Sequence, residues 1–193
     1  FKEGLVEVQD EGSQIAALLV GARPGMTVVD VCAGAGGKTL ALAAAMAEKG
    51  EVRGRLIACD AAPERLERMT PRLIRARADA VRRIVFENKN ESALAEFQGA
   101  ADRVLLDVPC SGSGAWRRDP LARWRLAPET LAGFCASQRL ILDDAQALVR
   151  RGGRLVYVTC SILPEENETI VAAFAAAHEE FRIVPVDRIP IEA

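Results

Sequence analysis

Two cysteines stand in sequence surroundings that would leave their thiols accessible. Cys110 lies in the segment DVPCSG (107–112), and Cys160 lies in the segment TCS (159–161). Each segment follows an apolar run, and the polar residues of both, with the glycine of the first, are typical of an open loop. A cysteine thiolate is a strong nucleophile, so both positions are candidates for covalent chemistry. Cys59 and Cys135 are instead expected to be buried, inert thiols.

A glycine-rich segment, CAGAGGKT (32–39), follows another apolar run, in which Asp30 is the acid. Its glycines allow a tight turn and a close approach of the backbone to a ligand at the start of a helix. Two nucleotide-binding motifs fail here, because Cys32 replaces the first P-loop glycine and Thr39 replaces the third glycine of the dinucleotide fingerprint. An acid followed by G-x-G resembles the arrangement in S-adenosylmethionine-dependent methyltransferases, and a purely structural turn is the alternative.

Asp60 ends a further apolar run, directly before a helix that starts with a proline. A carboxylate at this place can accept hydrogen bonds from both hydroxyls of a ribose, as it does in dinucleotide-binding folds. A helix-capping role is the alternative for this residue.

The composition limits other kinds of chemistry. The 193 residues are 50% hydrophobic with a net charge of −2, so one compact domain is expected, without a uniformly basic coat or an acidic tail. The single histidine, His178, ends a predicted surface helix and no C-x-x-C pair occurs, so no metal site and no histidine-based triad are predicted. The five cysteines are expected to be reduced. Without a membrane-spanning run or signal peptide features, a cytoplasmic protein is expected.

Five short apolar runs, with longer helical segments between them, predict the elements that position these residues. The runs are too short and too apolar for exposed alternating strands, which favours buried parallel strands. Strands are predicted at 27–32, 55–60, 83–87, 103–107 and 154–160, and helices at 12–19, 39–49, 63–80, 128–150 and 164–178. This alternation predicts an α/β fold, a mostly parallel sheet with helices on both faces. Ligands of such folds bind beyond the carboxyl ends of the strands, where both thiols would meet.

Four segments together resemble the signature motifs of RNA (cytosine-5) methyltransferases in order and spacing. They are CAGAGGKT (32–39), DVPCSG (107–112), TCS (159–161) and PEENE (164–168), and the opening segment EVQDEGSQ (7–14) is also similar to that family. Bacterial 16S ribosomal RNA methyltransferases are the most similar members, and the resemblance covers nearly the whole chain. It implies the Rossmann-like fold of S-adenosylmethionine-dependent methyltransferases.

The resemblance implies distinct roles for the two thiols. Carbon 5 of cytosine becomes nucleophilic only after a thiolate has added to carbon 6, so covalent catalysis is required. In the family the TCS thiol attacks, which carries over to Cys160, and the PCS thiol assists product release, which carries over to Cys110. Asp107 would face the target base and stabilise the charge that accumulates on it. Lys38 either helps to ionise Cys160 or tethers a loop carboxylate.

The resemblance also implies an S-adenosylmethionine site along the glycine-rich segment, with Asp60 on the ribose hydroxyls. An acid is usual beside the adenine, but this sequence offers Asn88 or Asn90 there. Asn88 is expected to contact the adenine, because an amide can both donate and accept hydrogen bonds. The expected cofactor contacts are Cys32, Ala33, Gly34, Ala35, Gly36, Gly37, Lys38, Asp60, Asn88 and Asp107.

An RNA-binding surface is predicted directly after the DVPCSG segment. Guanidinium groups suit phosphates, and indoles suit stacking on unpaired bases. Its residues are Trp116, Arg117, Arg118, Arg123, Trp124 and Arg125. Packing of the two tryptophans onto the body of the protein is the alternative. A second basic run, on the helix predicted at 63–80, is interleaved with acids and is expected to be a solvated face.

These observations predict that residues 1–193 form a monomeric methyltransferase catalytic domain that acts on RNA, and on ribosomal rather than transfer RNA. The resemblance implies that the amino-terminal RNA-binding domain usual in bacterial members is absent from this chain. It also implies a sixth strand at 181–186 whose antiparallel neighbour is missing. A DNA cytosine-5 methyltransferase, in which the PC thiol attacks, and a catalytically silent RNA-binding module of the same fold are the alternatives.

Overall fold

A five-stranded parallel sheet forms the centre of the protein, in a computed structural model that describes residues 2–85, 94–185 and 189. The strands are β1 (Thr27–Asp30), β4 (Arg55–Asp60), β5 (Arg82–Val85), β6 (Ala101–Asp107) and β7 (Val149–Val158). They are arranged in the order β5-β4-β1-β6-β7, and every neighbouring pair is parallel. The predicted α/β fold is therefore confirmed.

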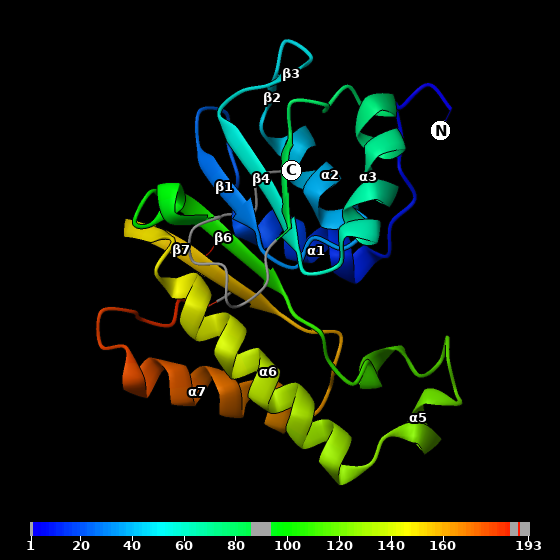
Figure 1. Ribbon diagram of the computed structural model, residues 1–193, viewed down its shortest axis with the longest axis vertical. Coiled ribbons are helices and arrows are strands. Elements are labelled where there is room, and N and C mark those ends of the chain that lie inside the picture. The colour runs from blue at the N-terminus through cyan, green and yellow to red at the C-terminus, as the bar shows by residue number, and fades with distance from the viewer. Residues whose placement is uncertain (1, 86–93, 186–188, 190–193) are drawn as a thin grey trace.

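Two layers of helices cover the sheet (Figure 1). The helices α1 (Glu11–Val20), α2 (Gly37–Ala45) and α3 (Pro63–Arg75) pack on one face, while α6 (Pro128–Gln146) and α7 (Glu168–Ala177) pack on the other. Successive residues of a strand point to opposite faces. Leu105 therefore packs towards α1 to α3, while Val104 and Leu106 pack towards α6 and α7. Because both faces of the central strands are buried, β1 and β4 are largely apolar, whereas the edge strand β5 carries the exposed Arg82 and Arg83.

Prolines mark the first turn of three helical segments, as the sequence predicts. Pro63 begins α3 and Pro128 begins α6, and Pro164 begins the short 3-10 helix η3 (Pro164–Glu166). A proline is tolerated there because an N–H group in the first turn has no helical partner.

The helix predicted at 164–178 is divided at Asn167, which separates η3 from α7 with a non-helical φ of −121° and ψ of −94°. The Asn167 side chain accepts a hydrogen bond from the Thr159 hydroxyl and donates to the carbonyls of Ser161 and Leu163. These bonds hold Asn167 against the loop after β7 in a non-helical conformation, so α7 starts at the next residue, Glu168.

The helix predicted at 39–49 is shorter than expected, because a hairpin follows α2. In this hairpin β2 (Ala47–Glu48) pairs with β3 (Glu51–Val52). The turn residues Lys49 and Gly50 both have positive φ, 54° and 80°. This is the conformation of a two-residue hairpin turn.

Other boundaries also differ from the prediction: the helix predicted at 63–80 ends at Arg75, and the strand predicted at 154–160 spans Val149–Val158. The helix predicted at 128–150 stops at Gln146, because Val149 already pairs with Ala101 in the sheet. Of the strand predicted at 181–186, residues 181–185 are not in a strand and residue 186 lies outside the described residues. Across the described ranges, no helix has the length and apolar character needed to cross a bilayer.

The turn between β1 and α2 depends on close packing at Gly36. This residue has a φ of +85°, and a Cβ built on it would lie 2.4 Å from Cγ of Met69. Met69 lies on α3 and is fully buried, so it has little room to move. Gly25 has almost the same φ, +87°, but a Cβ built there meets nothing within 4 Å. Substituting Gly25 therefore measures the free-energy cost of a side chain at positive φ, and substituting Gly36 adds the cost of the contact with Met69.

We expect Gly36→Ala to lower the free energy of unfolding more than Gly25→Ala does, as measured by urea denaturation. Both variants should lose about 1–3 kcal/mol for a non-glycine residue at positive φ. Gly36→Ala should lose about 1–3 kcal/mol more for overpacking against Met69. Equal losses in the two variants would contradict the packing role of Gly36.

Candidate active site

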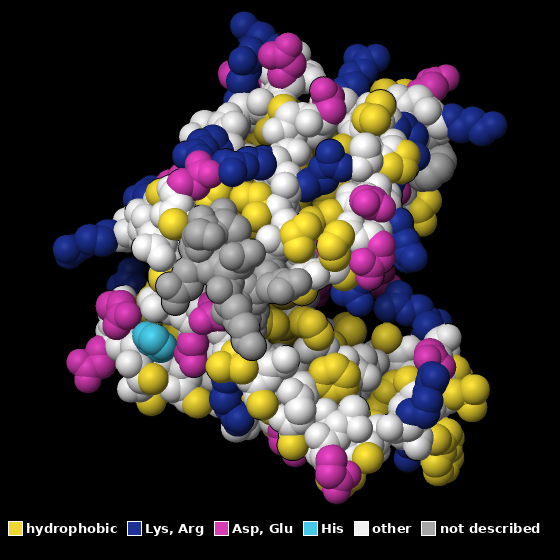
Figure 2. Space-filling view, viewed as in Figure 1, with side chains coloured by type: hydrophobic (Ala, Val, Ile, Leu, Met, Phe, Trp, Pro, Cys, Tyr) yellow, Lys and Arg dark blue, Asp and Glu magenta, His cyan; other side chains and the backbone are white. Residues whose placement is uncertain are grey.

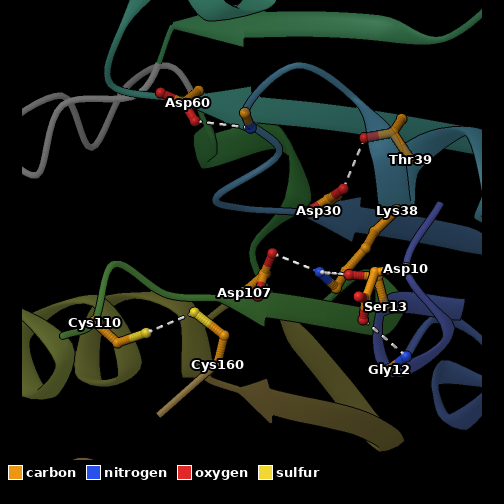
Figure 3. Close-up of polar contacts among 11 residues, drawn as sticks. Asp10, Gly12, Ser13, Asp30, Lys38, Thr39, Asp60, Asp107, Cys110 and Cys160 are labelled. Atoms are coloured by element: carbon orange, nitrogen blue, oxygen red, sulfur yellow. Dashed lines mark hydrogen bonds and ion pairs between the residues drawn. The ribbon is translucent and has the colours of Figure 1, made fainter. Parts of the chain in front are cut away.

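The loops after β1, β4, β6 and β7 gather at the carboxyl edge of the sheet (Figure 3). Asp30, Asp60 and Asp107 are the last residues of their strands, and Cys160 lies just after β7. Parallel strands bring these ends to one edge, which is where ligands of α/β folds bind. Figure 2 shows that the surface is indented between the part over α3 and the part over the short helix α5 (Ala122–Arg125).

The thiols of Cys110 and Cys160 are in contact. Their Sγ atoms lie 3.3 Å apart, although the residues are 50 positions apart in the sequence. The two loops are joined further by the Gly114 N–H, which donates to the Cys160 carbonyl at 2.9 Å, and by the Ile162 N–H, which donates to Ser113 Oγ at 2.8 Å. The meeting of the two thiols expected from the sequence is therefore present.

This contact lowers the pKa of Cys160. The hydrogen bond from Cys110 is the largest influence, burial and the Asp107 carboxylate oppose it, Lys38 adds to it, and the resulting pKa is about 6. The same contact raises the pKa of Cys110, which therefore keeps its proton and acts as the donor. An ordinary thiol with a pKa of about 8.5 is ionised only to a few per cent at neutral pH. The exposed Cys160 is thus the thiolate of the pair.

Lys38 is bound to a carboxylate of the site. Its Nζ lies 2.7 Å from Asp107 Oδ2 and 3.2 Å from Ser13 Oγ. The Lys38 side chain is only 12% exposed, so water screens this ion pair weakly. Of the two roles predicted for Lys38, the tether is seen directly, and its effect on the pKa of Cys160 ranks below that of the Cys110 hydrogen bond.

Asp30 is buried beneath the glycine-rich turn. Its Oδ2 accepts a hydrogen bond from the Thr39 hydroxyl at 2.7 Å, and its Oδ1 has no partner within the described part of the chain. Burial raises the pKa of Asp30 to about 7, although the bond from Thr39 opposes this rise. Thr39, the residue that excludes a dinucleotide fingerprint, therefore serves to join α2 to the end of β1.

Asp60 shapes the same turn from the neighbouring strand. Its Oδ2 accepts a hydrogen bond from the Gly34 N–H at 2.8 Å, and its Oδ1 accepts one from the Ala62 N–H at 2.9 Å. The second bond reaches the N–H of Ala62, which is the N-cap of α3, and this helix has no side-chain cap, so the capping role that the sequence left as an alternative is not seen. A carboxylate has about four lone-pair sites, so these two bonds leave capacity for hydroxyl donors.

The other residues predicted to hold the cofactor form the turn between β1 and α2, with one exception. Cys32 lies there as a mostly buried thiol, and burial raises its pKa to about 12, which makes it a poor nucleophile. The turn comprises Cys32, Ala33, Gly34, Ala35 and Gly36, followed by Gly37 and Lys38 at the start of α2. Asn88, predicted to contact the adenine, lies outside the described residues.

The two tryptophans predicted to bind RNA have different surroundings. Trp116 is partly buried, and its Nε1 is shielded from solvent with no partner among the residues that the structure describes. Trp124 on α5 is 82% exposed, and the guanidinium of Arg123 lies 5.8 Å from its ring centre. Trp116 thus packs against the body of the protein, whereas Trp124 offers a free face for stacking.

The predicted RNA-binding arginines are all exposed, and two of them form ion pairs on the surface. Arg118 lies 2.6 Å from Asp10, in the segment before α1, and Arg125 lies 2.7 Å from Asp119. Arg117 and Arg123 are exposed on the same segment. These pairs are weak in water, so the guanidinium groups are available to other anions.

Three residues of the site received no role from the sequence: Ser13, Gln138 and Glu166. Gln138 is a fully buried polar residue on the apolar face of α6, and such a position signals a buried hydrogen-bond network. Glu166 belongs to the PEENE segment, whose acidic residues predict a solvated position, but Glu166 is fully buried. The contact of Ser13 with Lys38 depends on the tertiary fold and left no signal in the sequence.

Comparison with protein families classifies the chain. The family model of the 16S rRNA methyltransferase RsmB/F matches residues 17–191, which include the glycine-rich turn and both thiol loops. The chain belongs to the 16S rRNA methyltransferase RsmB/F family. The resemblance drawn from the sequence motifs to the bacterial 16S ribosomal RNA enzymes is confirmed by this match.

Curated relatives that are similar in sequence to this RsmB/F chain are named as ribosomal RNA small subunit methyltransferases. The "Probable ribosomal RNA small subunit methyltransferase B" of Synechocystis sp. is 35% identical over 188 residues, and the "Ribosomal RNA small subunit methyltransferase B" of Thermus thermophilus is 37% identical over 183 residues. The alignments cover 97% and 94% of this chain, but 41% and 42% of the relatives. The chain therefore spans about two fifths of the length of these relatives.

Solved structures resemble the RsmB/F chain over nearly all of its length. The crystal structure of PH0851 is 39% identical, with a TM-score of 0.87, and covers 96% of this chain and 41% of its own. The structure of NSun6 from Pyrococcus horikoshii with SFG is 27% identical, with a TM-score of 0.79, and covers 92% of this chain and 44% of its own. The Rossmann-like methyltransferase fold predicted from the sequence is confirmed.

S-adenosylmethionine is the cofactor of this methyltransferase family, as the sequence predicts. The described residues fit such a ligand. Space is open over Gly34, which has a φ of +54° and nothing within 4 Å of a Cβ built on it. The Asp60 carboxylate adjoins this space through its bond to the Gly34 N–H, and Asp30 Oδ1 beneath the turn is a buried acceptor with no partner among the described residues.

We expect iodoacetamide to alkylate Cys160 with a pH midpoint near 6, because the thiolate is the reacting form. Cys110→Ala removes the donor and should raise this midpoint towards the ordinary value of about 8.5. The measurement is the rate of modification of the Cys160 peptide, followed by mass spectrometry over a pH series.

Cys110→Ser is the matched control, because a serine hydroxyl can still donate a hydrogen bond to the Cys160 thiolate. Its midpoint should lie closer to that of the unaltered protein than the Cys110→Ala midpoint does. An unchanged midpoint in Cys110→Ala would show that the thiol contact does not ionise Cys160.

Proposed function

We propose that this domain methylates carbon 5 of a cytosine in RNA, with small-subunit ribosomal RNA as the substrate and S-adenosylmethionine as the methyl donor. The observation that carries the proposal is the pair of thiols 3.3 Å apart, of which Cys160 has the lowered pKa. Membership in the RsmB/F family and the printed names of the relatives support ribosomal RNA as the substrate.

Cys160 is the nucleophile in this proposal. Its thiolate adds to carbon 6 of the cytosine, a C–S bond forms, and the electron pair of the 5,6 double bond moves into the ring. Carbon 5 then has enamine character and can be alkylated. S-adenosylmethionine supplies the electrophilic methyl group when it is bound. The lowered pKa of Cys160 supports this role, because the reacting thiolate is present without an added base.

Asp107 and Lys38 stabilise the charged ring in this proposal. Addition of a thiolate places negative charge on the ring nitrogen and carbonyl oxygen of the base. Hydrogen-bond donors that are already in place at a developing charge lower the barrier. Lys38 Nζ carries three such protons, and its bonds to Asp107 and Ser13 use two of them. Asp107 fixes Lys38, and the pair can present a proton to the base.

Cys110 acts in product release. After methyl transfer, the proton on carbon 5 and the Cys160 thiolate must both leave, which restores the 5,6 double bond. While Cys160 is held as a thioether it cannot accept the Cys110 hydrogen bond as a thiolate does, so the largest cause of the raised pKa of Cys110 is removed and only burial still raises it. Cys110 then loses its own proton to water, and the resulting thiolate takes the proton from carbon 5 while the C–S bond to Cys160 breaks and the Cys160 thiolate leaves.

The exposed residues after η2 (Ser113–Ala115) are proposed to hold the RNA. Trp124 offers a face for a neighbouring base, and Arg117, Arg123 and Arg118 offer guanidinium groups to phosphates. They follow directly on the loop that carries Cys110, so the bound strand would pass the thiol pair. Trp116 is proposed to keep this segment attached to the body of the protein.

We expect Cys160→Ala to reduce methyl transfer to 16S ribosomal RNA by at least about a thousandfold, because the residue removed forms the covalent bond. The measurement is incorporation of a radiolabelled methyl group from S-adenosylmethionine, with calorimetry to verify that the cofactor still binds. Cys135→Ala is the matched control, because it removes a buried thiol of α6 that bonds the Glu165 carbonyl and leaves the Cys110 and Cys160 sulfur atoms and the donors to the Glu166 carboxylate in place, so transfer should be retained.

Cys110→Ala is expected to accumulate a covalent complex of protein and RNA, because the methylated base is no longer released. The complex would be seen as a band of higher mass on a denaturing gel, and mapping of the labelled base would identify the target. Transfer that survives in Cys160→Ala but is lost in Cys110→Ala would assign the attack to Cys110, as in DNA cytosine-5 methyltransferases. Absence of cofactor binding in the unaltered protein would favour a silent RNA-binding module.

A further inference from the structure

Glu166 is a buried carboxylate at the end of η3, with no exposed surface. A buried charge is costly unless several hydrogen bonds compensate for it. Glu166 Oε1 accepts bonds from the Ser111 N–H at 2.8 Å and from Gln138 Nε2 at 3.0 Å, and Oε2 accepts the Ser111 hydroxyl. Within the described residues, no lysine or arginine pairs with it. This carboxylate is therefore held by neutral donors from two other elements.

These donors lie on both sides of Cys110. Ser111 follows Cys110 directly and gives both its N–H and its hydroxyl to Glu166. Pro109 precedes Cys110, and its carbonyl accepts a hydrogen bond from Gln138 Nε2 at 2.9 Å. Gln138 Nε2 also bonds Glu166, so one amide group joins the two flanks. The backbone on either side of the Cys110 thiol is thus fixed by this network.

The same residue is attached to the strand that leads to Cys160. The Tyr157 hydroxyl on β7 donates to the Glu166 carbonyl at 2.8 Å. The next residue, Asn167, accepts the Thr159 hydroxyl and donates to the Ser161 carbonyl, and these two residues flank Cys160. Glu166 is therefore the point at which the surroundings of both thiols are joined.

Glu166 is ionised in this network. Burial acts to raise its pKa, but the hydrogen bonds from Ser111, Ser161 and Gln138 outweigh burial and lower the pKa below its usual value. Tyr157 and Cys135 also face it; burial raises the pKa of each, and the negative charge of Glu166 adds to the rise. Burying a negative charge costs desolvation free energy, and a neutral side chain of the same size would fill the same space without that cost, so packing alone does not explain the charge.

We propose that Glu166 is a positioning residue that holds the Cys110 thiol against the Cys160 sulfur. It touches neither thiol and acts through Ser111 and Gln138 on the backbone around Cys110. The inference rests on the proposed function in one respect, namely that the thiol pair is the reacting pair. It adds to that function the group that sets the geometry of the pair.

Glu166→Gln tests this role, because it keeps the size of the side chain and removes its charge. The charged and titratable groups that act on the Cys160 thiol are Cys110, Asp107 and Lys38. Loss of a negative charge in the vicinity would by itself lower the pKa of Cys160. Loss of the Cys110 donor would raise it. The direction of the change therefore separates a positioning role from a purely electrostatic one.

We expect the pH midpoint for alkylation of Cys160 to rise in Glu166→Gln by about one unit, which is about tenfold less thiolate at a pH well below the midpoint. In methyl transfer, kcat should fall at neutral pH while the KM for S-adenosylmethionine stays unchanged. Ser111→Ala removes only the hydroxyl bond and keeps the N–H bond, so its midpoint should rise by less. This milder variant also serves if Glu166→Gln fails to fold.

Tyr157→Phe is the matched control, because it removes the bond to the Glu166 carbonyl and leaves the carboxylate bonds in place. It should lower the melting temperature without moving the midpoint. A midpoint that is unchanged or lower in folded Glu166→Gln, and unchanged in Ser111→Ala, would overturn the proposal. An equal rise in Tyr157→Phe would also overturn it, since the effect would then come from general disturbance.

Alkylation requires neither RNA nor a methyl donor, so the two proposals can fail separately. If the midpoints move as expected but the unaltered protein transfers no methyl group, the positioning role of Glu166 stands and the proposed function is wrong. If the unaltered protein methylates RNA but Glu166→Gln leaves the midpoint and kcat unchanged, the proposed function stands and the positioning role is wrong.

Discussion

The hydrogen bond between the thiols of Cys110 and Cys160 is the contact on which the proposed chemistry of the site depends. It requires two sulfur atoms from different loops to stay 3.3 Å apart. The parallel pairing of β6 with β7 brings the starts of these loops side by side, and the hydrogen bonds between the loops complete the alignment. The parallel sheet brings the two loops close together, and the hydrogen bonds between the loops set the final distance between the two sulfur atoms.

The two most deeply buried acids of the site show that burial alone does not decide the charge of a carboxyl. Burial acts to raise the pKa of both Asp30 and Glu166. Asp30 receives one bond, from Thr39, and its pKa stays raised, whereas Glu166 receives several bonds and its pKa is lowered. The donors that reach Glu166 lower its pKa against burial, whereas the single donor on Asp30 is outweighed by burial, to which the Asp107 and Asp60 charges add. Cys160 follows the same rule, since the bond from Cys110 outweighs burial and the Asp107 charge.

The order of the elements could be predicted from the sequence, because parallel strands buried on both faces leave short apolar runs between helical segments. The placement of both thiols in loops could also be predicted from the polar residues beside Cys110 and Cys160, although only Cys160 is exposed and Cys110 is half-buried. What could not be predicted depends on contacts between distant residues. The break at Asn167, for example, arises from bonds to the loop after β7, and no local propensity indicates it.

Side-chain partners were the least predictable part of the site. Lys38 could have contacted the thiol or a carboxylate, and only the tertiary structure pairs it with Asp107. Glu166 lies in an acidic segment that would normally be solvated, yet its side chain turns inward to donors from α6 and from the Cys110 loop. The strand that the resemblance implied at 181–186 is not formed over residues 181–185, because a strand also needs a neighbouring strand to pair with.

The ion pair between Arg118 and Asp10 has a consequence for how a polyanion meets this surface. Asp10 also accepts the Gly12 N–H as the N-cap of α1, and Ser13, one position further along, contacts Lys38. Only Nη1 of Arg118 contacts Asp10, so a phosphate can bind the other N–H groups of this guanidinium without breaking the pair. A phosphate that takes over Nη1 replaces an exposed ion pair, which costs little. The Gly12 N–H bonds the other carboxylate oxygen of Asp10, so the N-cap of α1 beside Lys38 stays intact in both cases.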